Sequence, residues 1–200
     1  MNVTPLPARP RVLRCGRCGR FVDWLEARLQ VVCSCRPRVD LPPVLTREAT
    51  DADRSAALDL FEGEFGHVQV VSSGEVVALA QLAMLVAGAH GEVGGALAWC
   101  RRDDALQIVA LATDPMWQRS GVGGHLLVEA EMLAAAAQLQ RVIVSMSNDN
   151  LPALYFYQRH GYRVTDVVMD AIAQRPADHG PGFGQIIARD EFRLEKRLNS

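Results

Sequence analysis

The segment at residues 106–162 constrains the fold of this chain more than any other. Its apolar run at residues 108–112 predicts a short buried strand, which ends at the turn pair Asp114-Pro115. A glycine-rich turn follows, and apolar residues then recur at helical spacing from His125 to about Gln140. The β-branched run at residues 142–144 predicts a second strand. Strand, glycine turn, helix and strand in this order predict a parallel crossover unit.

The glycine turn at residues 118–124 has the composition of an anion-binding loop. Gly121, Gly123 and Gly124 lack a Cβ, so an anion can approach the backbone closely. The first N–H groups of the following helix have no intrahelical partner, and the helix dipole favours negative charge there. Arg119 adds a guanidinium that can clamp a phosphate oxygen. The unit is therefore predicted to hold a phosphate or a pyrophosphate.

The spacing of the glycines excludes two common phosphate loops. No lysine follows the last glycine, which excludes the nucleoside-triphosphate loop, and Leu126 stands where a dinucleotide loop needs a glycine. The pattern Q-x-x-G-x-G at residues 118–123 resembles the pyrophosphate loop of the GNAT superfamily of acyl-CoA-dependent N-acyltransferases. A second GNAT signature, N-x-x-A-x-x-x-Y-x-x-x-G-[FY], is matched at its expected place by Asn150, Ala153, Tyr157, Gly161 and Tyr162.

The resemblance implies an α/β (α+β) fold for residues 44–198, with a mixed, twisted sheet and flanking helices. In this fold the sheet splays open beside the strand at residues 106–113, and acetyl-CoA enters the opening as co-substrate. Its pantetheine amides would pair with the strand edge at Leu111, Ala112 and Thr113, because an opened edge presents backbone groups without partners. The pyrophosphate would be held by the glycine turn, which comprises Gln118, Arg119, Ser120, Gly121, Val122, Gly123 and Gly124.

Asn150 has two interpretations. As a match to the family signature, it would bond the pantetheine arm of the cofactor. As a helix cap, it would precede a helix that begins near Leu151-Pro152, where proline fits the first turn. Both roles are compatible. Asn148, two residues earlier, is interpreted as turn chemistry.

The resemblance also implies the reaction, which moves an acetyl group to a primary amine of a small molecule or protein by direct attack. Tyr157 matches the general acid of the family and would also contact the cofactor; the alternative is a half-buried core aromatic. Glu191 is the candidate general base, because the last predicted strand should lie beside the splay. The alternative for Glu191 is a solvated charge on an edge strand. Further candidates for the general base are Asp190, Glu92, His90, His160 and a water chain.

Four of the five cysteines form a separate pattern near the N-terminus, with Cys15 and Cys18 as C-x-x-C and Cys33 and Cys35 as C-x-C. The first pair resembles the knuckle of a zinc ribbon, and four thiolates suit tetrahedral Zn²⁺. The second pair is one residue shorter than the usual knuckle. Residues 1–40 cannot build a core of their own, so we expect a four-cysteine module that zinc helps to fold. The alternative is a tail with four reduced cysteines.

Between these two features the chain shows alternating element signals. Leu41-Pro42-Pro43 marks a boundary, after which residues 44–49 predict a strand. Thr50 or Asp51 predicts the start of a helix that runs to about Phe65. Residues 67–82 are ambiguous and read as a short strand or loop and then a helical turn. The strands expected elsewhere are at 84–89, 93–100, 163–169 and 189–195, with a long loop at 171–188.

Composition limits the classes of partner. A net charge of −2 gives no basic footprint for nucleic acid or anionic lipid. No apolar run reaches the roughly 20 residues of a membrane span, and no secretory signal is visible. We therefore expect a cytoplasmic protein that binds acetyl-CoA and an amine acceptor and has no membrane partner; a homodimer is left open. The acidic balance also disfavours nucleic acid, although Arg11, Arg14, Arg17, Arg20, Arg36 and Arg38 make the N-terminal module locally basic and leave weak contact with nucleic acid open. The alternative function is a non-catalytic protein that senses acyl-CoA or binds a partner.

Overall fold

The computed structural model describes residues 13–14, 21–22, 44–72, 75–89, 91–118, 120–172 and 186–198. The chain divides into two units, Met1–Leu41 and Pro42–Ser200. In the first unit, β1 (Leu13–Arg14) pairs antiparallel with β2 (Phe21–Val22). The proposed zinc ligands lie outside the described residues, so zinc binding by Cys15, Cys18, Cys33 and Cys35 stays a prediction. Within the described residues, no cluster of three His, Cys, Asp or Glu side chains could hold a metal ion.

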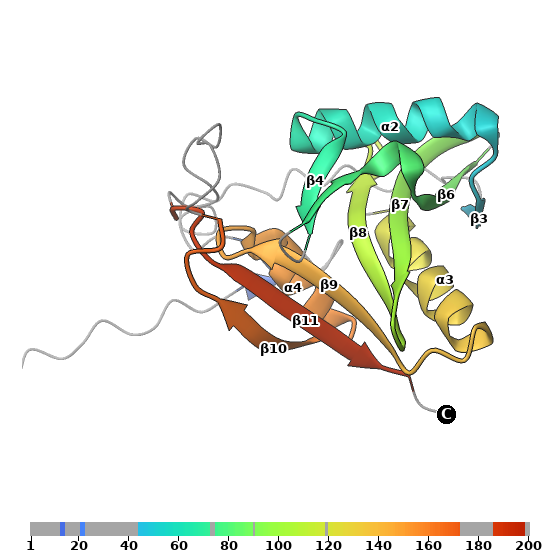
Figure 1. The fold of residues 1–200 in the computed structure, drawn as a ribbon. Coiled ribbons are helices and arrows are strands. Elements are labelled where there is room, and N and C mark those ends of the chain that lie inside the picture. Colours follow the sequence, from blue (N-terminus) through green and yellow to red (C-terminus); the bar gives the residue numbers. More distant parts are fainter. Residues whose placement is uncertain are drawn as a thin grey trace, which may run out of the picture. The chain divides into compact units, whose positions relative to one another are not determined.

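A seven-stranded sheet organises the second unit, in the order β10-β11-β9-β8-β7-β6-β3 (Figure 1). β8 and β9 are parallel, and all other neighbours in this sheet are antiparallel. The predicted mixed sheet and its parallel crossover are thus confirmed. The strands are β3 (Leu45–Glu48), β6 (Ala83–Ala89), β7 (Glu92–Arg102), β8 (Ala105–Thr113), β9 (Arg141–Ser147), β10 (Arg163–Val168) and β11 (Glu191–Arg197).

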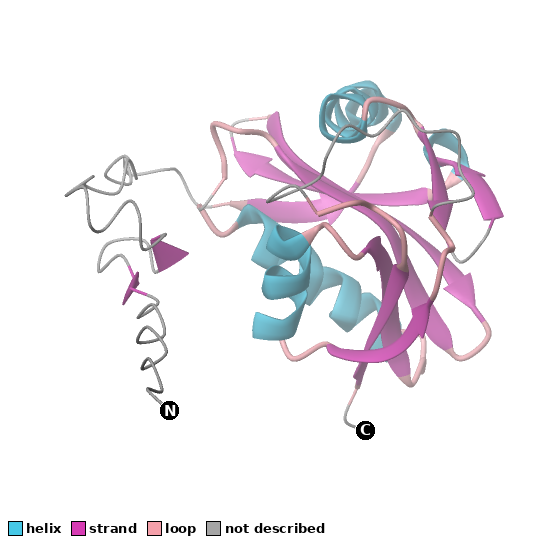
Figure 2. Cartoon of the chain, turned by 90° about the vertical axis from the view of Figure 1, so that its left-hand side faces the viewer, coloured by secondary structure: helices cyan, strands magenta, loops and turns pink. Residues whose placement is uncertain are grey.

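Helices cover both faces of this sheet (Figure 2). α3 (Val122–Ala136) and α4 (Leu151–Arg159) share one core with Leu97 of β7, and α2 (Asp51–Phe65) shares another with Ala96 and Ala98. Since neighbouring residues of a strand point to opposite faces, the two cores lie on opposite sides of the sheet. No helix in the described part of the chain is long and apolar enough to cross a membrane.

The start of α2 follows the predicted cap. The N–H of Thr50 donates to Asp53 Oδ2 at 2.8 Å, and the Thr50 hydroxyl donates to the same oxygen at 2.6 Å. Arg47 of β3 forms an ion pair with Asp53, with Nη2 2.8 Å from Oδ1. These bonds, chiefly the one from Arg47, hold the pKa of Asp53 well below its usual range. Strand β3 and helix α2 are therefore joined through one buried carboxylate.

Three elements differ from the sequence-based expectation. α3 begins at Val122, before the predicted start at His125. The prediction missed the first turn because it contains Gly123 and Gly124, and glycine is a poor helix former in isolation. The ambiguous segment forms a separate hairpin of β4 (Gln69–Ser72) and β5 (Glu75–Ala78), followed by the 3₁₀ turn η1 (Leu79–Gln81). The last strand lies between β9 and β10, so the interpretation of Glu191 as an edge-strand charge is wrong.

Candidate active site

Strands β8 and β9 separate partway along their length. Their parallel pairing ends at Ile108 and Val144, although β8 continues to Thr113 and β9 to Ser147. Beyond that point β9 keeps its pairing with β11 as far as Glu191. Figure 1 shows β9, β10 and β11 diverging together from β8. The sheet therefore opens beside β8, where the family resemblance implies a splay.

A β-bulge marks the point of separation. Ala98 and Trp99 are consecutive on β7, but they pair with Ala110 and Ile108 on β8, which leaves Val109 as an extra residue. A bulge bends its strand and increases the local twist, which turns the rest of β8 away from β9. Residues 109–113 consequently have no strand partner on the β9 side within the described chain. This is the edge predicted to pair with the pantetheine arm.

The N-terminus of α3 lies next to that edge. The first helical hydrogen bond runs from the N–H of His125 to the carbonyl of Gly121, so the N–H groups of residues 122–124 precede it. A Cβ on Gly123 would lie 3.6 Å from Thr113 Oγ1 and 3.5 Å from the ring of Phe156. The first turn of α3 thus lies between β8 and α4. Gln118 is exposed with Nε2 3.5 Å from the carbonyl of Thr113, and Arg119 lies outside the described residues.

Asn150 caps α4. Its Oδ1 accepts the N–H of Ala153 at 3.1 Å, and Pro152 stands in the first turn. The capping interpretation is confirmed, and contact with the pantetheine arm stays a prediction. Helix α4 begins next to the end of β9, because the N–H of Asn150 donates to the carbonyl of Ser147 at 3.1 Å.

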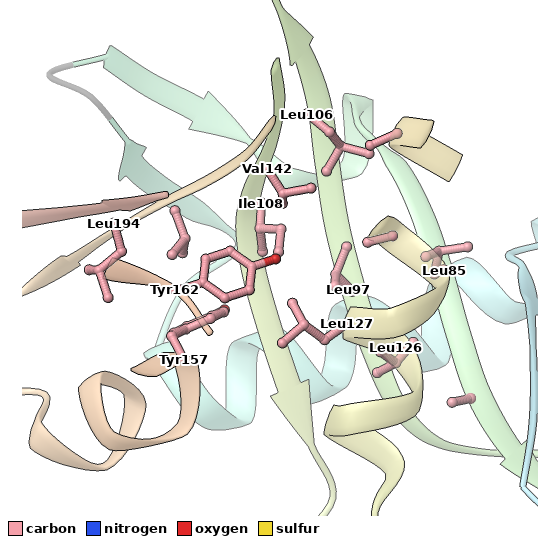
Figure 3. Packing of buried hydrophobic residues seen from close by; sticks show 14 of the residues in the cluster. Leu85, Leu97, Leu106, Ile108, Leu126, Leu127, Val142, Tyr157, Tyr162 and Leu194 are labelled. Carbon is pink, nitrogen blue, oxygen red and sulfur yellow. The ribbon is translucent and has the colours of Figure 1, made fainter. Parts of the chain in front are cut away.

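Tyr157 lies in the core between α4 and the sheet (Figure 3). Its ring centroid is 5.4 Å from that of Tyr162 and 5.2 Å from that of Phe156, both in edge-on geometry. The residue is only 5% exposed, and this burial raises the pKa of its phenol above the ordinary value. The phenol therefore stays protonated at neutral pH, the state that a general acid requires.

Glu191 is buried in the middle of the sheet at the end nearest the opening. It pairs with Ser147 of β9, and its Oε1 accepts a hydrogen bond from Arg193 Nε at 3.0 Å. Leu194, three residues later on the same strand, packs in the core with Tyr157. Side chains alternate along a strand, so Glu191 and Tyr157 lie on opposite faces of the sheet. The candidate acid and base thus belong to different faces of the sheet.

The other candidates for the base are placed less favourably. Glu92 is exposed at the turn between β6 and β7, and His90 lies outside the described residues. His160 Nδ1 lies 2.7 Å from the carbonyl of Phe156, at the end of α4. Its Nε2 would be 3.3 Å from a Cβ on Gly124, so the ring faces the first turn of α3. Asp190 accepts the N–H of Asp170 and shapes the start of β11.

Sequence reasoning missed Asn148, which does more than form a turn. Its Oδ1 accepts the N–H groups of Arg189 and Asp190 at 2.8 and 3.0 Å, and its Nδ2 donates to the carbonyl of Ile187 at 3.1 Å. The backbone N–H of Asn148 donates to the carbonyl of Asp190 at 2.9 Å. The end of β9 is thereby fastened to the segment that delivers Glu191. Because the partners are about 40 residues apart, no local pattern predicts this contact.

Comparisons with known proteins agree with this geometry. Residues 78–164 match a family described as the acetyltransferase (GNAT) domain. The Bacillus subtilis (strain 168) protein YxbD is 30% identical over 111 residues, which cover 54% of this chain and 69% of that protein.

Two solved structures share the fold. An IAA acetyltransferase from Bacillus cereus ATCC 14579 has a TM-score of 0.63 at 20% identity, covering 78% of this chain and all (100%) of its own. A Bacillus subtilis acetyltransferase in complex with CoA has a TM-score of 0.59 at 21% identity, covering 78% of this chain and 98% of its own. The chain belongs to the GNAT family and is an acyl-CoA-dependent acetyltransferase.

Proposed function

We propose that this enzyme binds acetyl-CoA in the opening between β8 and β9 and transfers its acetyl group to a primary amine of a small molecule or protein. The observation that carries the proposal is the end of β8–β9 pairing at Ile108 and Val144. It leaves residues 109–113 as an edge onto which an extended amide ligand can add by backbone hydrogen bonds. The solved Bacillus subtilis acetyltransferase with the same fold is a complex with CoA, which supports this assignment.

The cofactor contacts are divided between backbone and side chains. Leu111, Ala112 and Thr113 offer backbone groups to the pantetheine amides, and the N–H groups of residues 122–124 point to the diphosphate. Ser120 and Gly121 shape the turn before the helix, with Gly121 at φ 97°. Gln118, Arg119 and Asn150 complete the proposed set with polar side chains. The positive end of the α3 dipole adds electrostatic attraction for the diphosphate.

The proposed acetyl transfer uses groups from both faces of the sheet. An alkylamine has a pKa of about 10.4, so it must lose a proton before its nitrogen can attack the thioester carbon. Glu191 is proposed to take that proton on one face of the sheet. A β8 N–H near Ala112 stabilises the tetrahedral oxyanion. When the carbon–sulfur bond breaks, Tyr157 donates its phenolic proton to the departing thiolate on the other face.

An assay of free CoA thiol with acetyl-CoA and a panel of primary amines tests the proposal. We expect thiol release that depends on the amine, together with an acetylated product detected by mass spectrometry. Binding of acetyl-CoA without release on any amine would contradict the transferase reaction and favour the acyl-CoA-sensing alternative. The panel includes both small amines and peptide lysines, so it also identifies the class of acceptor.

We also propose that the N-terminal unit holds one Zn²⁺ through Cys15, Cys18, Cys33 and Cys35. The support is the ligand chemistry, since four thiolates suit a tetrahedral structural zinc. The pair β1 and β2 stands on either side of Cys15 and Cys18 in the sequence.

A further inference from the structure

We propose that Gly94 and Trp117 position the loop in front of α3, and thereby set the affinity for acetyl-CoA. This role rests on the acetyl-CoA site proposed above. Both residues lie outside the two signatures from which the site is predicted, and neither is proposed to touch the cofactor. Three sets of contacts join β7, the described loop residues 114–118 and 120, and the start of α3.

Gly94 lies at a second β-bulge, in β7. The pairing of β6 with β7 shifts register between Ala87 and Gly88, which leaves Gly94 as the extra residue. The glycine is buried, and its carbonyl accepts the N–H of Asp114 at 3.0 Å. Asp114 is the first residue after β8. The bulge therefore fixes the point at which the loop leaves the sheet.

Trp117 occupies the space that a side chain at Gly94 would need. An ideal Cβ on Gly94 would lie 2.5 Å from Cδ2 and 2.6 Å from Cγ of the indole, closer than real Cβ contacts. The next residue, Gly95, makes the same room for Val122, whose Cγ1 would lie 2.5 Å from a Cβ there. Two consecutive glycines thus let the loop and the first residue of α3 rest directly on the backbone of β7.

The main chain of Trp117 connects this packing to the N-terminus of α3. Its N–H donates to the carbonyl of Asp114 at 2.8 Å. Its carbonyl accepts the N–H of Ser120 at 3.2 Å and also the Ser120 hydroxyl. Gly121, the N-cap residue of α3, follows in the left-handed region. Displacing the indole must therefore move the backbone that is proposed to bind the diphosphate.

A double-mutant cycle, read out by isothermal titration of acetyl-CoA into the full-length chain, tests this role. G94A pushes the indole off the strand and W117A removes it, and we expect each to weaken binding at least about tenfold. In G94A/W117A no ring remains to collide with the new methyl group, so the affinity should equal that of W117A within about twofold. W117F retains a ring over Gly94 and should bind within about threefold of wild type.

G63A is the matched control, because Gly63 is exposed on α2 and a Cβ there meets nothing within 4 Å. It should bind acetyl-CoA like wild type. The positioning role is overturned if G94A binds like wild type, if the losses of G94A and W117A multiply in the double variant, or if W117F is as weak as W117A. Should G94A not fold, the comparison of W117A with W117F decides alone.

Urea unfolding of every variant separates loop positioning from general damage. W117A and G94A should lose more affinity than a loss of folded protein at the titration temperature can explain. A wild-type chain that does not bind acetyl-CoA overturns the proposed cofactor site together with this role. Wild-type binding with unchanged variants overturns the positioning role alone.

Discussion

Tyr157 is the residue whose environment bears most directly on the proposed acid step. Burial raises the pKa of its phenol, so the proton is present throughout the neutral range. Y157F removes that proton and keeps the ring that packs against Phe156 and Tyr162. We expect kcat to fall about 100-fold or more, because general acid catalysis contributes about 10²- to 10⁴-fold. The Kd for acetyl-CoA, measured by calorimetry, should change little.

Y155F serves as the control for that substitution. Tyr155 lies on the same helix but is exposed at its surface. Its loss of a hydroxyl should leave kcat unchanged. If Y157F keeps the wild-type kcat with the best amine of the panel, Tyr157 is a core aromatic and not the acid.

Asp53 gives a second prediction at the residue scale, on stability. Its pKa is lowered in the folded chain by Arg47 and Thr50, below the unfolded value of about 3.9. The ionised carboxylate therefore stabilises the fold fully above about pH 4, and this contribution is lost as pH falls through the folded pKa. Replacing it by D53N should lower the free energy of unfolding by about 1–2 kcal/mol at pH 7.

Urea denaturation at pH 7 and pH 3 checks the sign. The gap in unfolding free energy between wild type and D53N should shrink at pH 3, since the wild-type carboxylate gains protons as the chain unfolds. D59N is the matched control, because Asp59 is exposed on the same helix. Equal stabilities of D53N and D59N would refute the role given to the buried carboxylate.

At the scale of elements, Asn148 is expected to hold the start of β11. N148A leaves the N–H groups of Arg189 and Asp190 without their side-chain acceptor, which should cost about 1–3 kcal/mol of unfolding free energy. Hydrogen exchange at residues 189–191 should become faster. N148D keeps both acceptor contacts and loses only the donation to Ile187. Its exchange rate at residues 189–191 should therefore lie between those of wild type and N148A. Unchanged exchange in N148A would contradict this anchoring.

The elements that sequence predicts well are those with local signals. Thr50 indicates the start of α2 because its own helix supplies its partner, Asp53. The glycine signature at residues 118–123 likewise indicates the loop before α3, and the signature that begins at Asn150 indicates the cap of α4. In both cases the residues that form the feature lie within a few positions of one another in the sequence. The splay is expected from family resemblance alone, because nothing local in residues 108–110 signals the bulge at Val109.

Other features depend on contacts between distant segments, and sequence could not supply them. Gly123 and Gly124 have low helix propensity, yet α3 includes them where Phe156 of α4 and its C-cap residue His160 pack closely. Glu191 is central in the sheet because β11 inserts between β9 and β10, an order that periodicity does not encode. The fit of Trp117 against Gly94 joins residues of different elements that have no shared pattern.

At the scale of the whole molecule, we expect zinc to bind to the N-terminal unit and acetyl-CoA to bind to the second unit. Elemental analysis of chain purified without chelator should find about one zinc per chain, since four thiolates complete one tetrahedral site. Replacing Cys15 and Cys18 by serine should abolish that zinc. Replacing Cys100 by serine, on β7, should leave it unchanged. No stoichiometric zinc in the wild-type chain would refute the metal site.

The central claim is that acetyl-CoA adds to the freed edge of β8 while the first turn of α3 holds its diphosphate. Amide hydrogen exchange, measured with and without saturating acetyl-CoA, tests both contacts at once. We predict slower exchange at residues 111–113 and 122–124 and no change at β3, an edge strand separated from β8 by β7 and β6. Binding that leaves both segments unprotected, or no binding at all, would contradict the account.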